Sequence, residues 1–214
     1  MCQEVYELVL EKGKDNLELQ LALQCAPLIS GLKISNLLIT KSGNLVPVQK
    51  MLQRSGLSHL LLYRTEQRLE LLLFRVEELE AYLEKPEVYA MLKRLGYRGH
   101  SLTKLLLYFQ KRYRIYKAGN LGFPHEFGLF LGYPVEDVCG FMEHHGRNFL
   151  YNGYWKVYGE LPDKLKLFQR FVFAEQALAR LLSEGIQLTE ALQNKELVTG
   201  RMPSAALEPG MADC

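Results

Sequence analysis

Apolar residues recur at two spacings in the first part of the chain. Helical spacing predicts a short amphipathic helix over Gln3–Lys12, which ends before Gly13. In Leu17–Gln24 the leucines alternate as in a strand, whereas the helix-forming Leu, Glu, Gln and Ala residues favour a helix. Asp15 and Asn16 are capping candidates for that helix, so we favour the helix and keep the strand as the alternative.

Strand patterns are clearer in the next part of the chain. Ile34–Thr40 predicts a strand, and Val46–Arg54 predicts a helix. Two apolar runs, Leu57–Arg64 and Arg68–Arg75, are joined by the short segment Thr65–Gln67. This arrangement predicts an antiparallel hairpin whose strands are buried on both faces.

Helical periodicity returns after the hairpin. It predicts helices over Val76–Leu83, Pro86–Leu95 and Ser101–Tyr116, the last with its serine as N-cap. Within Phe123–Gly146, prolines and glycines divide the pattern into two short helices joined by a tight turn.

The last part of the chain predicts a strand, a long helix and a tail. Asn152–Gly159 has the aromatic composition of a strand, and Asp163–Glu184 predicts a long helix. Residues 198–214 show no periodicity, so we expect one domain over residues 1–197 followed by a mobile tail. About four strands among roughly seven or eight helices, without regular alternation, predict an α+β fold: a small antiparallel or mixed sheet packed by several helices.

Composition excludes several protein classes. The chain has 214 residues, of which 48% are hydrophobic and 23% charged, and its formal net charge is +2, which excludes collagen, coiled coils and disordered chains. No apolar run reaches the ~18 residues of a membrane span. The acidic first residues do not fit a secretory signal, and the four cysteines have no paired spacing. We therefore expect a cytoplasmic protein with free thiols and no membrane contact.

Two long motifs carry a family resemblance. Phe123–Phe141 (FPHEFGLFLGYPVEDVCGF) and Gly153–Gly159 (GYWKVYG) resemble a bacterial family catalogued as domain of unknown function 3793. Cys25–Pro27, followed by Gly31–Lys33, is similar to the N-terminal signature of that family. One departure is Asn152, at a position where the family often has a cysteine. The resemblance implies no activity and transfers no catalytic or binding residue.

His125 and Glu126 form the first candidate site. We expect both in the first turn of a helix that has Pro124 at its first position and ends at Gly132. The positive end of that helix favours a neutral imidazole, which suits a general base or a metal ligand, and it also favours the Glu126 carboxylate. The alternative is that Glu126 caps the helix and His125 closes the loop through a hydrogen bond.

Cys25 is the second candidate, since Ala26 and Pro27 after it suggest the end of a helix. A thiolate beside Lys33 or His125 would be a nucleophile, as in enzymes that pair cysteine with histidine. The alternative is a thiol buried in the core, the usual place for a free cysteine.

The aromatic segment near residue 155 is the third candidate. As a strand it would place Tyr154, Lys156 and Tyr158 on one face and Trp155 and Val157 on the other. The first face could bind a planar or anionic ligand through its phenols and its ammonium group. It could equally be a solvated sheet face.

The fourth candidate is a basic segment, Lys93–Lys117, which contains no Asp or Glu. Its cations are Lys93, Arg94, Arg98, Lys104, Lys111, Arg112, Arg114 and Lys117, and aromatic residues lie between them. Such a segment could bind phosphates or a single-stranded nucleic acid. Alternatively it could pair with the acidic segment Glu66–Glu87 of the same chain or form a solvated face.

Other chemistries are disfavoured. The helix pair within Phe123–Gly146 has glycines at helix-turn-helix spacing, but its second helix would present Glu136 and Asp137 to the DNA phosphates. Neither His144–His145 nor Cys139 with His144 has chelating spacing, so no metal site is predicted. The sequence contains no recognisable cofactor motif.

Our leading hypothesis is a protein that binds a small ligand or cofactor in a cleft lined by Phe123–Glu126 and Gly153–Gly159. Tyr133 and Cys25 are further contributors to that cleft. The first alternative is an interaction protein that uses Lys93–Lys117 to bind a nucleic acid or an acidic protein. The second is an enzyme that depends on Cys25 and His125.

Overall fold

Three antiparallel strands form the main sheet of the protein, whose computed structural model describes residue 13 and residues 15–203. They are β1 (Ser35–Lys41), β2 (Ser58–Arg64) and β3 (Arg68–Phe74), in the order β1-β3-β2. β2 and β3 form the predicted hairpin, and every residue of β3 after Arg68 is buried. Helices cover both faces of this sheet, which is why β3 carries leucines on both sides.

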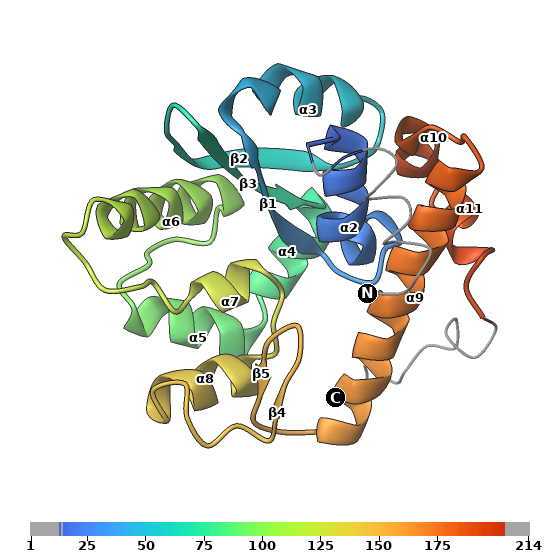
Figure 1. Cartoon of the computed structure of the whole chain (residues 1–214). Coiled ribbons are helices and arrows are strands. Elements are labelled where there is room, and N and C mark those ends of the chain that lie inside the picture. Colours follow the sequence, from blue (N-terminus) through green and yellow to red (C-terminus); the bar gives the residue numbers. More distant parts are fainter. Residues whose placement is uncertain (1–12, 14, 204–214) are drawn as a thin grey trace.

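One face of the sheet packs against the first described helix and the C-terminal helices (Figure 1). These elements are α2 (Leu17–Ile29), η1 (Ser42–Asn44), α3 (Leu45–Met51), α9 (Leu161–Ser183), α10 (Leu188–Gln193) and α11 (Glu196–Thr199). α2 lies between β1 and α9, and Leu69, Leu71 and Leu73 of β3 point into this core. The sequence left α2 open between helix and strand; it is a helix, and the side chain of Asn16 caps it by accepting the N–H of Leu19.

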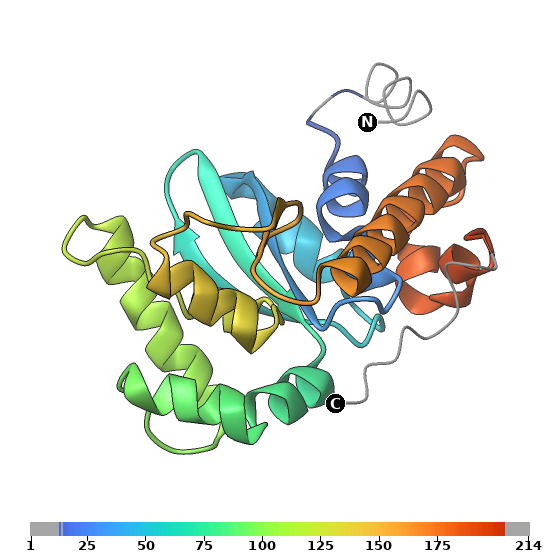
Figure 2. The same cartoon turned by 90° about the horizontal axis from the view of Figure 1, so that it is seen from below.

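The opposite face packs against the five helices from the middle of the chain (Figure 2). They are α4 (Val76–Leu83), α5 (Pro86–Arg94), α6 (Leu102–Lys117), α7 (Phe127–Phe130) and α8 (Val135–Glu143). Leu72 and Phe74 of β3 point into this second core, where Phe109 and Phe130 stack with ring centroids 4.3 Å apart. The fold is therefore α+β, as predicted, with its sheet between two layers of helices.

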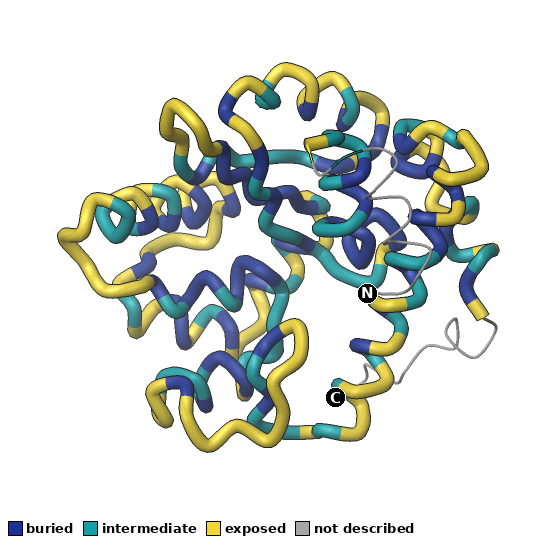
Figure 3. The backbone as a smooth tube through the Cα atoms, viewed as in Figure 1, coloured by how far each residue is buried: buried dark blue, intermediate teal, exposed yellow. Residues whose placement is uncertain are grey.

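A small hairpin replaces the long aromatic strand that the sequence predicted. β4 (Tyr151–Asn152) and β5 (Lys156–Val157) pair antiparallel, with Tyr151 opposite Val157 and the turn between them. The single strand over Asn152–Gly159 was therefore wrong, because the chain reverses within it. Figure 3 shows the exposed tip of this hairpin, while Trp155 and Val157 are buried against α9.

The sheet also contains a buried carboxylate, Glu70, on the face that carries Leu72. Its oxygens accept hydrogen bonds from the hydroxyl of Tyr113 at 2.7 Å and from Nζ of Lys117 at 2.8 Å. Arg68 adds an ion pair at 2.7 Å. A buried charge is tolerated only when it is paired and hydrogen-bonded, so this cluster joins α6 to the sheet.

The chain remains packed slightly beyond the expected domain boundary. Val198 and Met202 belong to the first core, whereas the sequence placed the start of a mobile tail at residue 198. The remainder of that tail, and the helix predicted over Gln3–Lys12, lie outside the described residues. Among residues 15–203, no helix combines the length and apolar character needed to cross a membrane.

Candidate functional site

Cys25 lies inside α2 rather than at its end. The helix continues through Pro27 to Ile29, so the sequence-based placement of Cys25 at a helix terminus was wrong. The side chain is fully buried, and Asn36 Nδ2 lies 3.8 Å from its Sγ. Burial raises the pKa of the Cys25 thiol to about 12, although the Asn36 hydrogen bond and the charge of Lys33 oppose the shift. Cys25 is therefore a neutral thiol at physiological pH.

Lys33 follows α2, and its ammonium group lies close enough to Cys25 for the charges of the two groups to interact. Its Nζ donates to Oδ1 of Asn36 at 2.8 Å and lies 5.1 Å from the ring centroid of Tyr133. Burial lowers the pKa of Lys33 to about 8, with a smaller opposing effect from Cys25. Within residues 15–203, no carboxylate forms an ion pair with Lys33.

Tyr133 connects Lys33 to the small hairpin. Its ring stacks on Trp155, with centroids 4.7 Å apart and an angle of 26° between the planes. Its backbone carbonyl accepts a hydrogen bond from the hydroxyl of Tyr82 at 2.5 Å, and burial raises the pKa of the Tyr133 phenol to about 12. The segments containing Lys33, Tyr133 and Trp155 are far apart in the sequence and meet at this point.

Asp137, near the start of α8, attaches the hairpin to the helix. Its side chain is 2% exposed. One oxygen accepts the indole N–H of Trp155 at 2.7 Å, and the other accepts the backbone N–H groups of Tyr158 at 2.7 Å and Gly159 at 3.3 Å. These bonds fix the ring of Trp155 against Tyr133.

Glu126 serves a different role from the one that the sequence suggested. α7 begins at Phe127, three residues later than expected, and the Glu126 side chain makes no capping hydrogen bond. Its carboxylate is 1% exposed and accepts hydrogen bonds from Nε of Arg112 at 2.5 Å and from the hydroxyl of Tyr97 at 3.1 Å. The charge of Glu126 is thus used to join α6 to the loop before α7.

His125 precedes Glu126 and is only partly buried. Its ring contacts Phe123 and Phe141, with centroids 5.6 Å and 5.3 Å away. The Nδ1 atom is buried and has no hydrogen-bond partner among the described residues. No hydrogen bond in that part of the chain joins His125 to Cys25, the pair that the enzyme hypothesis requires.

The three polar residues of the hairpin point in different directions. The hydroxyl of Tyr154 donates to Glu175 of α9 at 2.6 Å, whereas Nζ of Lys156 donates to the carbonyl of Gly146 at 2.6 Å, just after α8. Tyr158 lies over Gly140 and stacks on His144, and its buried hydroxyl has no partner among residues 15–203. The expected common face was wrong, because it assumed one continuous strand.

Lys156 and His125 nevertheless meet at one side chain. Both lie against the ring of Phe141 on α8: the centroid of the His125 ring is 5.3 Å away and Nζ of Lys156 is 5.6 Å away. The two segments that the sequence singled out for a cleft therefore approach the same helix. Within the described residues, no group of three or more His, Cys, Asp or Glu side chains could hold a metal ion.

The basic segment divides into an inward and an outward set. Arg112 and Lys117 bind the buried carboxylates of Glu126 and Glu70, and Nε of Arg114 donates to the carbonyl of Leu62 at 3.2 Å. The outward set is Lys93, Arg94, Arg98, Lys104 and Lys111. All five are exposed and form no ion pair within residues 15–203.

Lys33 and Asp137 are two site residues that no sequence motif singled out. Lys33 lies between Leu32 and Ile34, and a single cation between apolar residues is the signal that could have identified it as partly buried. Asp137 entered the sequence analysis only as an acid that disfavours DNA binding, and its contact with Trp155 depends on tertiary structure alone.

Comparisons with known proteins identify a family but no activity. A family model described as "Protein of unknown function (DUF3793)" matches residues 21–192, which is most of the chain and includes Cys25, Lys33, His125, Tyr133, Asp137 and the β4–β5 hairpin. No curated protein and no solved structure matches the chain.

Proposed function

The chain belongs to the family described as protein of unknown function (DUF3793), and we propose that it binds a small, planar, anionic ligand beside Lys33, Tyr133 and Trp155. Lys33 supplies the positive charge that attracts the ligand. The Tyr133–Trp155 stack supplies a rigid aromatic edge. This proposal retains the hairpin and Tyr133 from the sequence-based cleft and adds Lys33.

One observation carries the proposal: Lys33 is a partly buried charge that has no counter-charge among the described residues. The three buried carboxylates, Glu70, Glu126 and Asp137, are each held by two or more hydrogen bonds. Lys33 has one neutral amide partner and an aromatic ring. A cation removed from water is costly unless it is paired, so an anion that reaches Lys33 would be bound favourably.

Two further polar atoms support a site on this side of the molecule. Nδ1 of His125 and the hydroxyl of Tyr158 are buried and unpartnered among the described residues, and both side chains pack on α8. Buried polar groups without partners are uncommon in folded proteins. A ligand or ordered water that satisfies them would extend the site from Lys33 along α8.

We further propose that the protein is located in a reducing compartment, the cytoplasm of a bacterium. Cys25 and Cys139, the two described cysteines, are free. Cys139 lies 3.7 Å from the sulfur of Met91 rather than near another thiol.

Pyridoxal phosphate tests the proposal, because it is a planar, anionic aldehyde that forms an imine with a neutral lysine. At pH 7.5, an amine with a pKa of about 8 is neutral roughly two hundred times more often than an ordinary lysine. After borohydride reduction and mass spectrometry, we expect Lys33 to be labelled about tenfold more than the exposed Lys50 and Lys166, and the adduct to quench Trp155, the single tryptophan.

Pyridoxal without the phosphate separates binding from reactivity. Preferential labelling of Lys33 by the phosphorylated compound supports anion recognition, and K33M should abolish both the label and the quenching. Equal labelling of Lys33 by the two aldehydes, or labelling no greater than at Lys50 and Lys166, would overturn the proposal.

A further inference from the structure

Exposed cations remain on α5, on the loop after it and on α6, although acidic residues are available elsewhere in the chain. Arg112 and Lys117 are neutralised by buried carboxylates, but the outward set that includes Lys93, Arg98 and Lys104 is not. Pairing within the chain therefore explains Arg112 and Lys117 in the last turns of α6 but not Lys111 or the cations before it. The cations near its start need another explanation.

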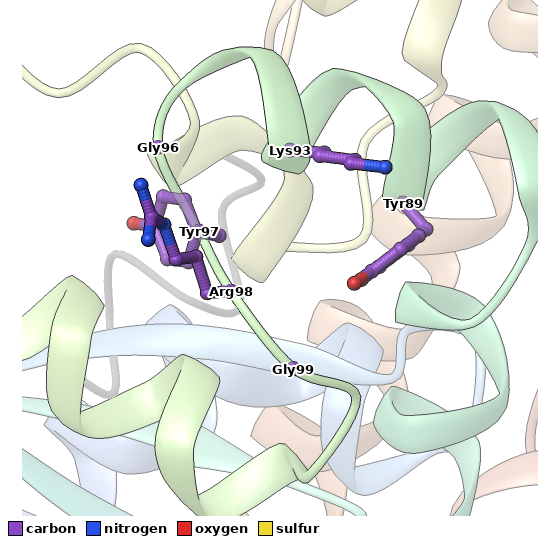
Figure 4. A pocket seen from close by; sticks show the side chains of 6 residues that line it. All are labelled: Tyr89, Lys93, Gly96, Tyr97, Arg98 and Gly99. Carbon is purple, nitrogen blue, oxygen red and sulfur yellow. The ribbon is translucent and has the colours of Figure 1, made fainter.

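Two adjoining cavities lie among these cations. The first, of about 430 Å³, is lined by Tyr89, Lys93, Gly96, Tyr97, Arg98 and Gly99. The second, of about 580 Å³, is lined by Gly96, Tyr97, Arg98, Lys104, Leu105 and Tyr108. Both are open, no acidic residue lines either one, and the segment Gly96–Arg98 separates them. Figure 4 shows Tyr89 and Lys93 on α5 at one side of the first cavity and Tyr97 and Arg98 at the other, with the Arg98 side chain directed away from α5.

The segment between the cavities is held in place. Gly96 and Gly99 have φ values of +91° and +81°, a region that favours glycine. Tyr97 is 1% exposed, donates its hydroxyl to Glu126 and packs edge-on against Tyr108 at 4.7 Å. Arg98 therefore projects from a fixed position between the cavities.

Aromatic rings accompany the cations on both sides. On the first side, Tyr89 stacks with His100, with centroids 4.1 Å apart. On the second side, Tyr108 is 38% exposed, and the guanidinium of Arg112 lies 6.0 Å from its ring centroid. Fixed and partly exposed rings beside unpaired cations match the two parts of a nucleotide, the base and the phosphate.

We propose that this surface, formed by Tyr89, Lys93, Tyr97, Arg98, Lys104 and Tyr108, binds single-stranded nucleic acid. Lys93, Arg98 and Lys104 contact the phosphates, and the rings of Tyr89 and Tyr108 stack on bases. A single strand fits better than a duplex because its base faces are free to stack, whereas a duplex is read by an element that protrudes into a groove. The two cavities on either side of Arg98 accommodate successive nucleotides.

Fluorescence anisotropy with a labelled oligothymidine of roughly ten nucleotides tests this proposal on the full chain. We expect saturable binding at low salt. Three phosphate contacts predict a slope of log K against log salt of about −2 for a single strand.

Two variants separate charge from stacking. R98E/K104E should weaken binding at least tenfold and reduce the magnitude of the salt slope by at least about 1. Y108L should weaken binding about tenfold and leave the salt slope unchanged, since stacking does not release counterions. K50E/K166E is the matched control, because it makes the same change in net charge at exposed lysines on α3 and α9.

Several results would overturn the inference. The first is that the full chain does not bind the oligothymidine at low salt. The second is that K50E/K166E weakens binding as much as R98E/K104E does. The third is that Y108L, shown by circular dichroism to be folded, binds as tightly as the wild type. Equally effective competition by polyglutamate of the same length would assign the surface to an acidic protein. Saturable binding of a free mononucleotide without binding of the oligothymidine would also contradict it.

Discussion

Substitution of Asp137 tests whether one carboxylate holds the hairpin in place. D137A removes the acceptor for the Trp155 indole N–H at 2.7 Å and for the Tyr158 backbone N–H at 2.7 Å. Trp155 is 8% exposed, so its N–H would find little water in compensation. A hydrogen bond to a charged group contributes about 1.5–3 kcal/mol, so the loss of two predicts destabilisation of about 3–6 kcal/mol. That is a large part of the ~5–15 kcal/mol that stabilises a typical domain.

D137N should lie between D137A and the wild type. The asparagine oxygen can still accept the Tyr158 N–H, but its amide group would face the Trp155 N–H and lose that bond. We expect a loss of about 1.5–3 kcal/mol for D137N. E136A is the control: Glu136 is 51% exposed in an ion pair with Lys164 and should contribute under about 1 kcal/mol.

Urea unfolding monitored by fluorescence and by far-ultraviolet circular dichroism measures these effects. Trp155 is the single tryptophan, so fluorescence reports directly on the hairpin. In D137A the fluorescence transition should occur at a lower urea concentration than the circular dichroism transition, because the hairpin detaches before the two cores unfold. The reasoning is refuted if D137A unfolds within 1 kcal/mol of the wild type, or if E136A is equally damaging.

Two further predictions concern Lys33 and Gly140. The folded pKa of Lys33 is about 8 against an ordinary value of 10.5, so between these pH values the unfolded chain binds more protons and folding is favoured as pH rises. The unfolding free energy of the wild type minus that of K33M should therefore increase from pH 8 to 10. Urea midpoints of the two proteins that stay parallel over this range would contradict this expectation. In G140A the new Cβ would lie 2.5 Å from Cγ of Tyr158, so we expect destabilisation of about 1–3 kcal/mol in the same assay, offset in part by helix propensity. G43A, where the Cβ meets nothing within 4 Å, is the control and should change stability by less than about 1 kcal/mol.

The sequence predicted the main elements well because their signals are local. The β2–β3 hairpin and the helices α4, α5, α6 and α9 follow from periodicity and from turn residues, and their observed bounds differ by only a few residues. Cys25 was misplaced because Pro27 was taken to end the helix. In the last turn, Pro27 removes only one backbone donor, and its own carbonyl accepts the N–H groups of Leu32 and Lys33.

The site was harder to predict because its contacts are not local. Alternation cannot distinguish one strand from two short strands joined by a turn, so Tyr154, Lys156 and Tyr158 were assigned to one face. Arg112 lies in a uniformly basic segment, and its attachment to Glu126 depends on how α6 packs against the loop before α7. The sequence identified the relevant segments but not which side chains are already engaged.

The distribution of charge in the folded protein connects the two binding proposals. All three carboxylates that the described residues bury are hydrogen-bonded by the chain itself, while Lys33, Lys93, Arg98 and Lys104 have no acidic partner among those residues. A net charge of +2 therefore hides an uneven distribution, in which three carboxylates are buried and paired while these four cations have no acidic partner among the described residues. An anion that binds only the folded state stabilises it by mass action, by about 2.7 kcal/mol at a hundred times its Kd. Stabilisation that is lost in K33M would assign an anion to the Tyr133 site, and stabilisation that is lost in R98E/K104E would assign it to the surface between α5 and α6.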